Sequence, residues 1–150
     1  MANFESKTMS TTFKLAEDKN VIALRNLLDH TVTDWGDMNY DFDGYNGTYC
    51  IYCFGSICGY VEDLEAYDNG DEEPDYDLFC EKMQELLTDK GCVIIYSIGS
   101  EKFRYFNANA TVITKHRIDF VTLRKIAEDR AKNLIDEEIQ DIIKSKKENK

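Results

Sequence analysis

The order of apolar patterns along the chain is the feature that constrains its fold most strongly. Two β-prone runs, Thr48–Phe54 and Ile57–Leu64, are separated only by a Gly-Ser pair. Two more, Cys92–Ile98 and Phe103–Thr114, are joined by a short segment that also begins with Gly-Ser. Such short connections join antiparallel neighbours, because a parallel crossover needs a dozen or more residues. The pattern therefore predicts a mainly antiparallel sheet, in which the nearly continuous apolar run Cys92–Ile98 is covered on both faces.

Helical periodicity is present in three segments, Lys19–His30, Tyr76–Lys90 and Asp119–Lys144. A short first strand is expected at Thr11–Leu15, where polar and apolar residues alternate. The predicted fold class is α+β, with one sheet of about five strands, helices packed on one face and a long C-terminal helix. This last helix is too long to lie wholly on a small sheet. It either breaks near Asn133 or extends into a partner, and a homodimer through it is one expectation.

The composition indicates a single domain. A chain of 150 residues with one proline and eight glycines has no Pro/Gly-rich linker, so residues 1–150 are expected to form one unit, with 1–10 and 145–150 frayed. We expect a cytoplasmic protein, because there is neither a signal peptide nor a membrane-spanning apolar run. An odd number of cysteines, five, favours reduced thiols over disulfides.

Acidic residues are concentrated in the middle of the chain. The formal net charge is −11, yet residues 34–89 alone hold sixteen acids against one base, Lys82, which gives 1 − 16 = −15. Such a charge repels nucleic acid and anionic membranes and favours encounters with basic surfaces. The same window contains seven of the nine tyrosines and the only tryptophan, and aromatic residues are enriched at interface cores.

A partner-binding face is therefore predicted within this window. A solvated acidic face with tyrosines packed on the sheet is the alternative interpretation. The candidate contact residues are Trp35, Asp37, Tyr40, Asp41, Asp43, Tyr45, Glu62, Asp63, Glu65, Tyr67, Asp71, Glu72, Glu73 and Asp75.

Two segments bear a partial likeness to metal sites. The segment Asn39–Gly44 matches the first half of a calcium loop, but the position that requires a bidentate Glu is Cys50. Cys50, Cys53 and Cys58 have zinc-like spacing, but side chains three apart on a strand face opposite sides. We expect no metal and no other cofactor, and a small metal- or ligand-binding domain is kept as the alternative.

No catalytic residue is predicted. The two histidines, His30 and His116, lie beside no recognisable nucleophile or acid motif, and no phosphate-cradling loop precedes a helix. The chain is therefore expected not to be an enzyme.

In composition the chain resembles small acidic inhibitors of phages and mobile elements, which imitate the charge of nucleic acid. This resemblance implies a non-enzymatic protein that occupies the nucleic-acid-binding surface of a partner, such as a host defence nuclease. A structural subunit of a larger assembly, joined through the last helix, is a further alternative.

Overall fold

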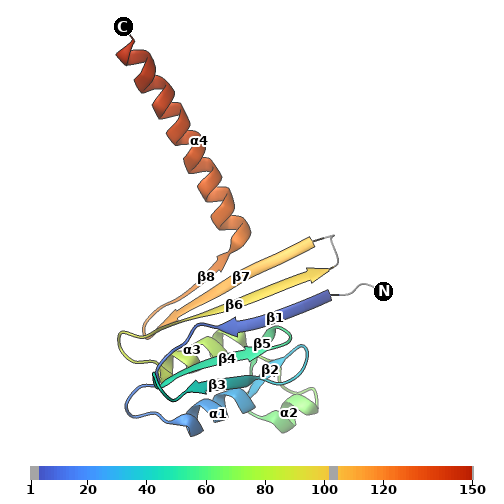
Figure 1. Cartoon of the computed structure of the whole chain (residues 1–150). Helices are drawn as coiled ribbons and strands as arrows, with labels where there is room; N and C mark the ends of the chain where they lie inside the picture. The colour runs from blue at the N-terminus through green and yellow to red at the C-terminus, as the bar shows by residue number, and fades with distance from the viewer. Residues whose placement is uncertain (1–3, 102–104, 150) are drawn as a thin grey trace.

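The computed structural model describes residues 4–101 and 105–149 (Figure 1). Its elements follow in the order β1 (Phe4–Ser10), α1 (Val21–Asp29), β2 (Thr31–Thr33), β3 (Asn39–Asp43), β4 (Thr48–Cys53), β5 (Ile57–Tyr60), α2 (Leu64–Asp68), α3 (Tyr76–Leu86), β6 (Cys92–Glu101), β7 (Tyr105–Thr114), β8 (Ile118–Thr122) and α4 (Leu123–Glu148).

The main sheet has six strands in the order β3-β4-β1-β6-β7-β8, and every neighbouring pair in it is antiparallel. Strands β2 and β5 form a separate two-stranded antiparallel sheet. The predicted α+β class and the antiparallel sheet are confirmed, with six strands in place of about five. The predicted hairpin of Cys92–Ile98 with Phe103–Thr114 corresponds to β6 and β7, although residues 102–104 lie outside the described residues.

Strand β1 corrects the expectation that residues 1–10 are frayed, since residues 4–10 form an inner strand between β4 and β6. Thr8 and Ser10, the two buried side chains among residues 6–10, carry hydroxyls rather than apolar groups, so no hydrophobic pattern revealed the strand. Thr8 donates from Oγ1 to the carbonyl of Gly55 at 2.8 Å, and the oxygen of Ser10 accepts from the amide of Ile51 at 2.9 Å. These bonds satisfy polar groups that would otherwise be costly to bury. The strand expected at Thr11–Leu15 is reduced to isolated bridges.

The predicted hairpin of Thr48–Phe54 with Ile57–Leu64 is wrong. Strand β4 pairs with β3 and β1, whereas β5 leaves the main sheet and pairs with β2. The chain changes direction at Gly55, which is buried beneath the loop after β2. A Cβ atom on Gly55 would lie 2.0 Å from Oδ1 of Asp34, and the same oxygen accepts from the amide of Ser56 at 2.6 Å.

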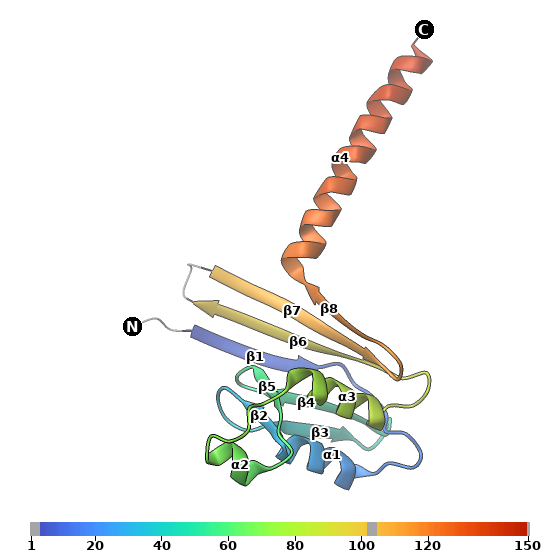
Figure 2. The same cartoon turned by 180° about the vertical axis from the view of Figure 1, so that it is seen from behind.

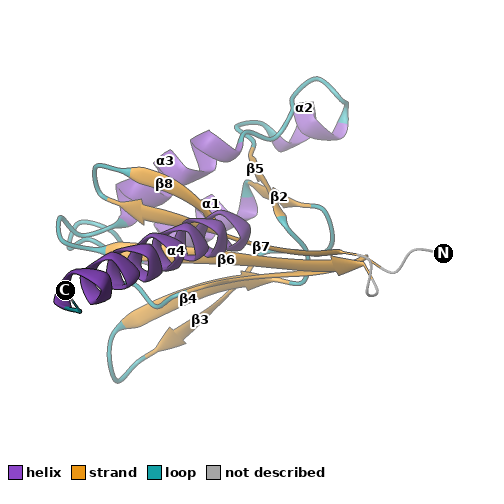
Figure 3. Cartoon of the chain, turned by 90° about the horizontal axis from the view of Figure 1, so that it is seen from above, coloured by secondary structure: helices purple, strands orange, loops and turns teal. Residues whose placement is uncertain are grey.

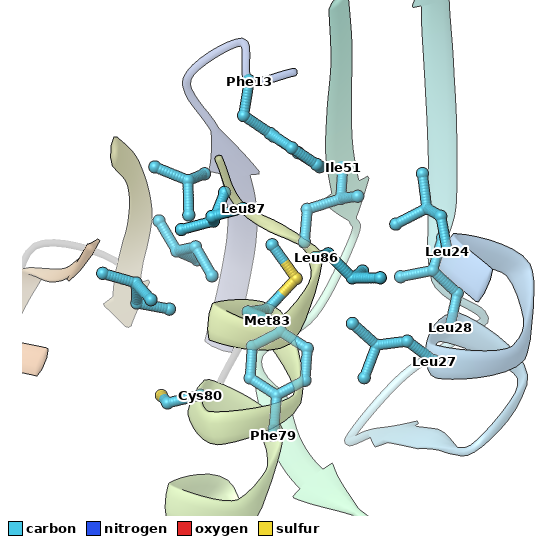
Figure 4. Packing of buried hydrophobic residues seen from close by; sticks show 13 residues of the cluster. Phe13, Leu24, Leu27, Leu28, Ile51, Phe79, Cys80, Met83, Leu86 and Leu87 are labelled. Atoms are coloured by element: carbon cyan, nitrogen blue, oxygen red, sulfur yellow. The ribbon is translucent and has the colours of Figure 1, made fainter. Parts of the chain in front are cut away.

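Helices α1 and α3 cover one face of the sheet, and the core lies between them and the strands (Figure 4). Asn20 caps α1 and Asp75 caps α3, in each case by accepting backbone N–H groups. Helix α3 ends at Leu86, four residues before the predicted end, because the next residue is extended. The fully buried side chains include Leu24, Ile51, Phe79, Met83, Leu87, Val93, Ile95 and Ile113.

The opposite face of the main sheet carries none of α1, α2 and α3 (Figure 3). Cross-strand pairing places Tyr52, Met9, Tyr96, Ala110 and Val121 in one row across this face. Tyr96 is 46% exposed and Ile98, which lies further along β6, is 50% exposed. The expectation that Cys92–Ile98 is covered on both faces is therefore wrong.

Helix α4 begins four residues after the predicted start at Asp119, which instead belongs to β8. Thr122 caps it by accepting the amide of Lys125 at 3.1 Å. The helix continues without a break near Asn133 and includes residues 145–148, which were expected to be frayed. It projects away from the rest of the protein (Figures 1 and 2), and all of its side chains are exposed.

Candidate interaction surfaces

The largest group of predicted contact residues lies in an excursion between β5 and α3, residues 62–75, which we call the α2 lobe. Its eight acids are Glu62, Asp63, Glu65, Asp68, Asp71, Glu72, Glu73 and Asp75, and it contains no lysine or arginine. All of these acids are exposed except Glu72, which is half-buried. None of the eight takes part in an ion pair among the described residues, so their charge is not neutralised locally.

The α2 lobe is held in place by its own carboxylates. Glu72 accepts the amides of Glu62 and Asp63 with its two oxygens, at 2.7 and 2.9 Å. Asp63 in turn caps α2 by accepting the amides of Glu65 and Ala66 at 3.0 and 3.2 Å. Bonds between a carboxylate and backbone N–H groups are charge-assisted and therefore strong for their class. They give the lobe a defined backbone without any basic residue.

The base of the α2 lobe is pinned to the body of the protein. Tyr60 and Asp75 exchange backbone hydrogen bonds of 2.9 and 3.0 Å where the chain leaves and re-enters. Gly59, with φ of +150°, permits this approach, because a Cβ there would lie 2.4 Å from the carbonyl carbon of Asp75. Val61 is fully buried, and its carbonyl is 2.8 Å from Nδ1 of His30. The lobe is therefore a fixed projection.

The remaining predicted acids lie along β3 and its turn into β4. Asp41 and Asp43 are exposed, and Asp43 accepts from the amides of Tyr45 and Asn46 and from Nδ2 of Asn46 at 2.9, 3.3 and 2.8 Å. These bonds, that with the Asn46 side chain above all, lower the pKa of Asp43. The β3–β4 turn and α2 lie on opposite sides of the body from which α4 projects (Figures 1 and 2). The fourteen predicted contact residues therefore do not form one surface.

The predicted aromatic anchors differ in exposure. Trp35 is 71% exposed and Tyr45, in the β3–β4 turn, is 96% exposed. Tyr40 is only half-exposed and is engaged by Arg25, whose Nε donates to its hydroxyl at 2.8 Å. Tyr67 is half-buried in α2, while Asp37 is exposed in the loop that follows Trp35. Of the four aromatic residues, only Trp35 and Tyr45 present most of their surface to solvent.

The two segments that resemble metal sites do not bring their candidate ligands together. Asn39, Asp41 and Asp43 belong to strand β3, and Cys50 and Cys53 belong to β4. Cys53 is buried while Cys58 is exposed, and all five cysteines are free thiols. Among residues 4–101 and 105–149, no three His, Cys, Asp or Glu side chains are grouped as a metal site requires.

A cleft of about 410 Å³, which sequence reasoning missed, opens on the helix-bearing side of the sheet. The residues that line it belong to β1, β6, β7, β8, α3 and the start of β5, and none of them carries a charge. The hydroxyls of Tyr76 and Thr111 meet there at 2.6 Å. Burial raises the pKa of Tyr76 to about 12, so its hydroxyl stays protonated at neutral pH. The lining provides hydrogen bonds but no general acid or base that titrates near neutral pH.

An apolar surface begins at the root of α4. A groove of about 180 Å³ is lined by Tyr96, Ile98, Ala108, Ala110, Leu123 and Ile126, among others. The small side chains of β7 form its floor, and the first turn of α4 forms one wall. Further along α4, Leu134, Ile135, Ile139, Ile142 and Ile143 are each between 43% and 56% exposed. Exposed apolar side chains grouped in this way are typical of interaction surfaces.

Comparison with known protein families, with curated proteins and with solved structures finds no match to this chain. Of the helices in the described residues, none combines the length and apolar character that a bilayer-crossing segment requires.

Proposed function

We propose that this chain is a non-enzymatic interaction protein whose α2 lobe occupies a basic, normally nucleic-acid-binding surface of a partner protein. The observation that carries this proposal is the lobe itself, with eight acids, no basic residue and a backbone fixed by Glu72, Asp63 and the Tyr60–Asp75 bridge. A rigid array of unpaired carboxylates loses little conformational entropy on binding.

The mechanism is competition for the same lysines and arginines. Double-stranded DNA presents one negative charge per about 1.7 Å of axis and releases counterions when a protein neutralises its phosphates. Unpaired carboxylates offer the same cationic groups an alternative set of anions. Partners with such surfaces include defence nucleases and other DNA-processing enzymes. Trp35 supplies an exposed anchor of the type that dominates interface energetics. Asp41, Asp43 and Tyr45 would extend the contact only for a partner that reaches both sides of the body.

The five free cysteines support a cytoplasmic place of action, where thiols are kept reduced.

The test is capture from a cell lysate followed by elution with a short DNA duplex. Proteins released by the duplex are those whose nucleic-acid-binding surface the bait had occupied. The lobe variant reverses four exposed acids that cap no helix, Glu62→Lys, Glu65→Lys, Asp71→Lys and Glu73→Lys. The control variant reverses four exposed acids elsewhere, Glu17→Lys, Asp18→Lys, Glu81→Lys and Asp89→Lys, with the same change in net charge.

We expect the lobe variant to lose the duplex-eluted protein and the control variant to keep it. Binding should also weaken steeply with salt, because the Debye length falls from about 10 Å at 0.1 M to about 3 Å at 1 M. Equal binding by the two variants, or a complex indifferent to salt, would contradict the proposal.

A second role, self-assembly, is favoured by one specific observation. The 26 residues of α4 project from the body, and every side chain of the helix is exposed. After Leu123, which begins the helix, six of these exposed side chains are leucine or isoleucine. We propose that α4 joins this chain to a second copy.

A further inference from the structure

The apolar side chains of α4 follow a spacing that limits how a partner helix can pack. Six of them recur at every fourth residue without interruption. They are Leu123, Ala127, Ala131, Ile135, Ile139 and Ile143. A left-handed coiled coil requires alternating steps of three and four, which this row lacks. Rows of the i, i+4 type run obliquely across a helix, and two such rows interlock when the helices cross at about −50°.

The row is also symmetric in a way that suits self-pairing. The midpoint of the row along the helix is at the level of Asn133. A two-fold axis that passes between the two helices at this level maps each member of the row onto another member. Ala131 then faces Ile135 of the second copy, and Ala127 faces Ile139. Placing a small side chain opposite a large one allows the helices to approach closely and fill the space between them.

The charges of α4 select the antiparallel orientation. Residues 124–132 contain four bases and two acids, for a charge of 4 − 2 = +2, and residues 134–142 contain four acids and no base, for −4. The same two-fold axis at Asn133 superposes the first segment on the second. A parallel, in-register pair would instead set −4 against −4, and would set alanine against alanine within the row.

One pair of side chains agrees with this register. Arg130, at the flank of the row, is placed opposite Asp136 of the second copy. Arg130 now makes an exposed ion pair with Glu137 of its own helix at 3.2 Å, and exposed pairs of this kind contribute little and exchange easily.

From these observations we propose that two copies of the chain pair through α4 in an antiparallel crossing centred on Asn133. The inference rests on the proposed self-assembly role, and it adds the orientation, the register and the crossing. An isologous contact of this type closes on itself, so the product is a dimer rather than a filament. The two bodies then lie at opposite ends of the paired helices, with both α2 lobes free.

The test compares matched variants of the full chain by sedimentation equilibrium. Ile135→Glu places a charge in the apolar row, and Gln140→Glu places the same charge on another face of α4. Both side chains are exposed, so neither variant disturbs the core. We expect the dissociation constant of the dimer to rise about a hundredfold for Ile135→Glu, because two isoleucines are lost per dimer, and to change little for Gln140→Glu.

The orientation is measured with a spin label at Ser145→Cys, in a background with Cys50, Cys58 and Cys92 replaced by serine. Residue 145 lies twelve residues from Asn133, so two antiparallel labels are about 35 Å apart at a rise of about 1.5 Å per residue. Parallel labels at the same crossing angle would be about 18 Å apart.

A label distance near 35 Å together with the Ile135→Glu effect supports the proposal. A dimer with a short label distance would overturn the orientation and register while leaving self-assembly intact. A dimer equally stable in both variants places the contact elsewhere and overturns the proposal. A wild-type chain that stays monomeric at about 200 μM, well above a micromolar dissociation constant, overturns self-assembly as well. None of these results bears on the α2 lobe, which is tested separately by capture from a lysate.

Discussion

Replacing Glu72 by glutamine is the sharpest test of whether the α2 lobe is held rigid by its own carboxylates. Glu72 accepts the amides of Glu62 and Asp63 at 2.7 and 2.9 Å, one with each oxygen. Glutamine keeps one oxygen as a neutral acceptor, but it presents an NH₂ group to the other amide. Two donors then face each other, so one hydrogen bond is lost and the other loses its charge assistance.

The expected loss is about 1 kcal/mol of unfolding free energy. At the lower values, two hydrogen bonds to a charged group contribute about 3 kcal/mol and one neutral bond about 0.5 kcal/mol. Both bonds are exposed, so water replaces much of what is lost and reduces the difference to about 1 kcal/mol. For a chain of this size, about 1 kcal/mol corresponds to a fall of roughly 2–4 °C in the melting temperature. The change in global stability is therefore small, and the loss of order is concentrated in the α2 lobe.

The matched control is Glu73→Gln, which removes the same charge from the adjacent, exposed residue. Urea unfolding gives the stability of each variant, and amide hydrogen exchange reports on the lobe itself. We expect the amides of Glu62 and Asp63 to exchange about fivefold to tenfold faster in Glu72→Gln than in Glu73→Gln, in line with about 1 kcal/mol of local stability. Indistinguishable exchange and stability in the two variants would show that charge, and not the carboxylate bridge, determines the order of the lobe.

Three further outcomes are expected. Met83→Ala, which empties a fully buried site between α3 and the sheet, should lower the unfolding free energy by about 2–5 kcal/mol in urea titrations. Burial raises the pKa of Tyr76 from 10.0 to about 12, so its neutral form stabilises the fold fully below pH 10. This stability should be lost as the pH rises from about 10 to 12, and Tyr76→Phe should reduce that slope in pH-dependent melting. In thiol labelling of the native protein at pH 8, the exposed Cys58 and Cys92 should react first. Cys58 should be the slower of the two, because burial and the charge of Asp34 raise its pKa and lower its thiolate fraction.

The sequence predicted well those elements whose own residues contain the whole pattern that identifies them. Helices α1 and α3 each place an apolar stripe on the core, and the β6–β7 hairpin joins two runs with one short connection. Strand β1 was missed because its buried side chains, Thr8 and Ser10, are stabilised by hydrogen bonds to distant segments. Periodicity of apolar residues does not register such a strand.

The error at Gly55 has a similar origin. A Gly-Ser pair between two β-prone runs is a natural hairpin connection, and nothing local opposes it. The deciding contacts come from Asp34, whose side chain lies against Gly55 and accepts the amide of Ser56. Strand pairing was therefore set by a residue about twenty positions earlier in the chain.

For the candidate site, the sequence predicted the charge of the acidic window but not its division in space. Asp37 and Asp43 are close in sequence, yet the extended strand that lies between them, Asn39–Asp43, alone spans about 14 Å at about 3.4 Å per residue. The acids that remain clustered are those in the α2 lobe, where the chain leaves and re-enters at the Tyr60–Asp75 bridge. The two ends of the lobe meet only in the folded protein, so no local sequence pattern predicts that these acids lie together.

The inner position of β1 has a consequence for how the protein acquires its structure. On a ribosome β1 is made before β6, so the contact of greatest sequence separation between them, the pairing of Phe4 with Glu101, must wait until β6 has emerged. Until then one edge of β1 has no neighbour, and non-local pairing of this kind slows folding. The nascent chain therefore carries an open strand edge until β6 has emerged, and an unpaired edge of this kind favours aggregation.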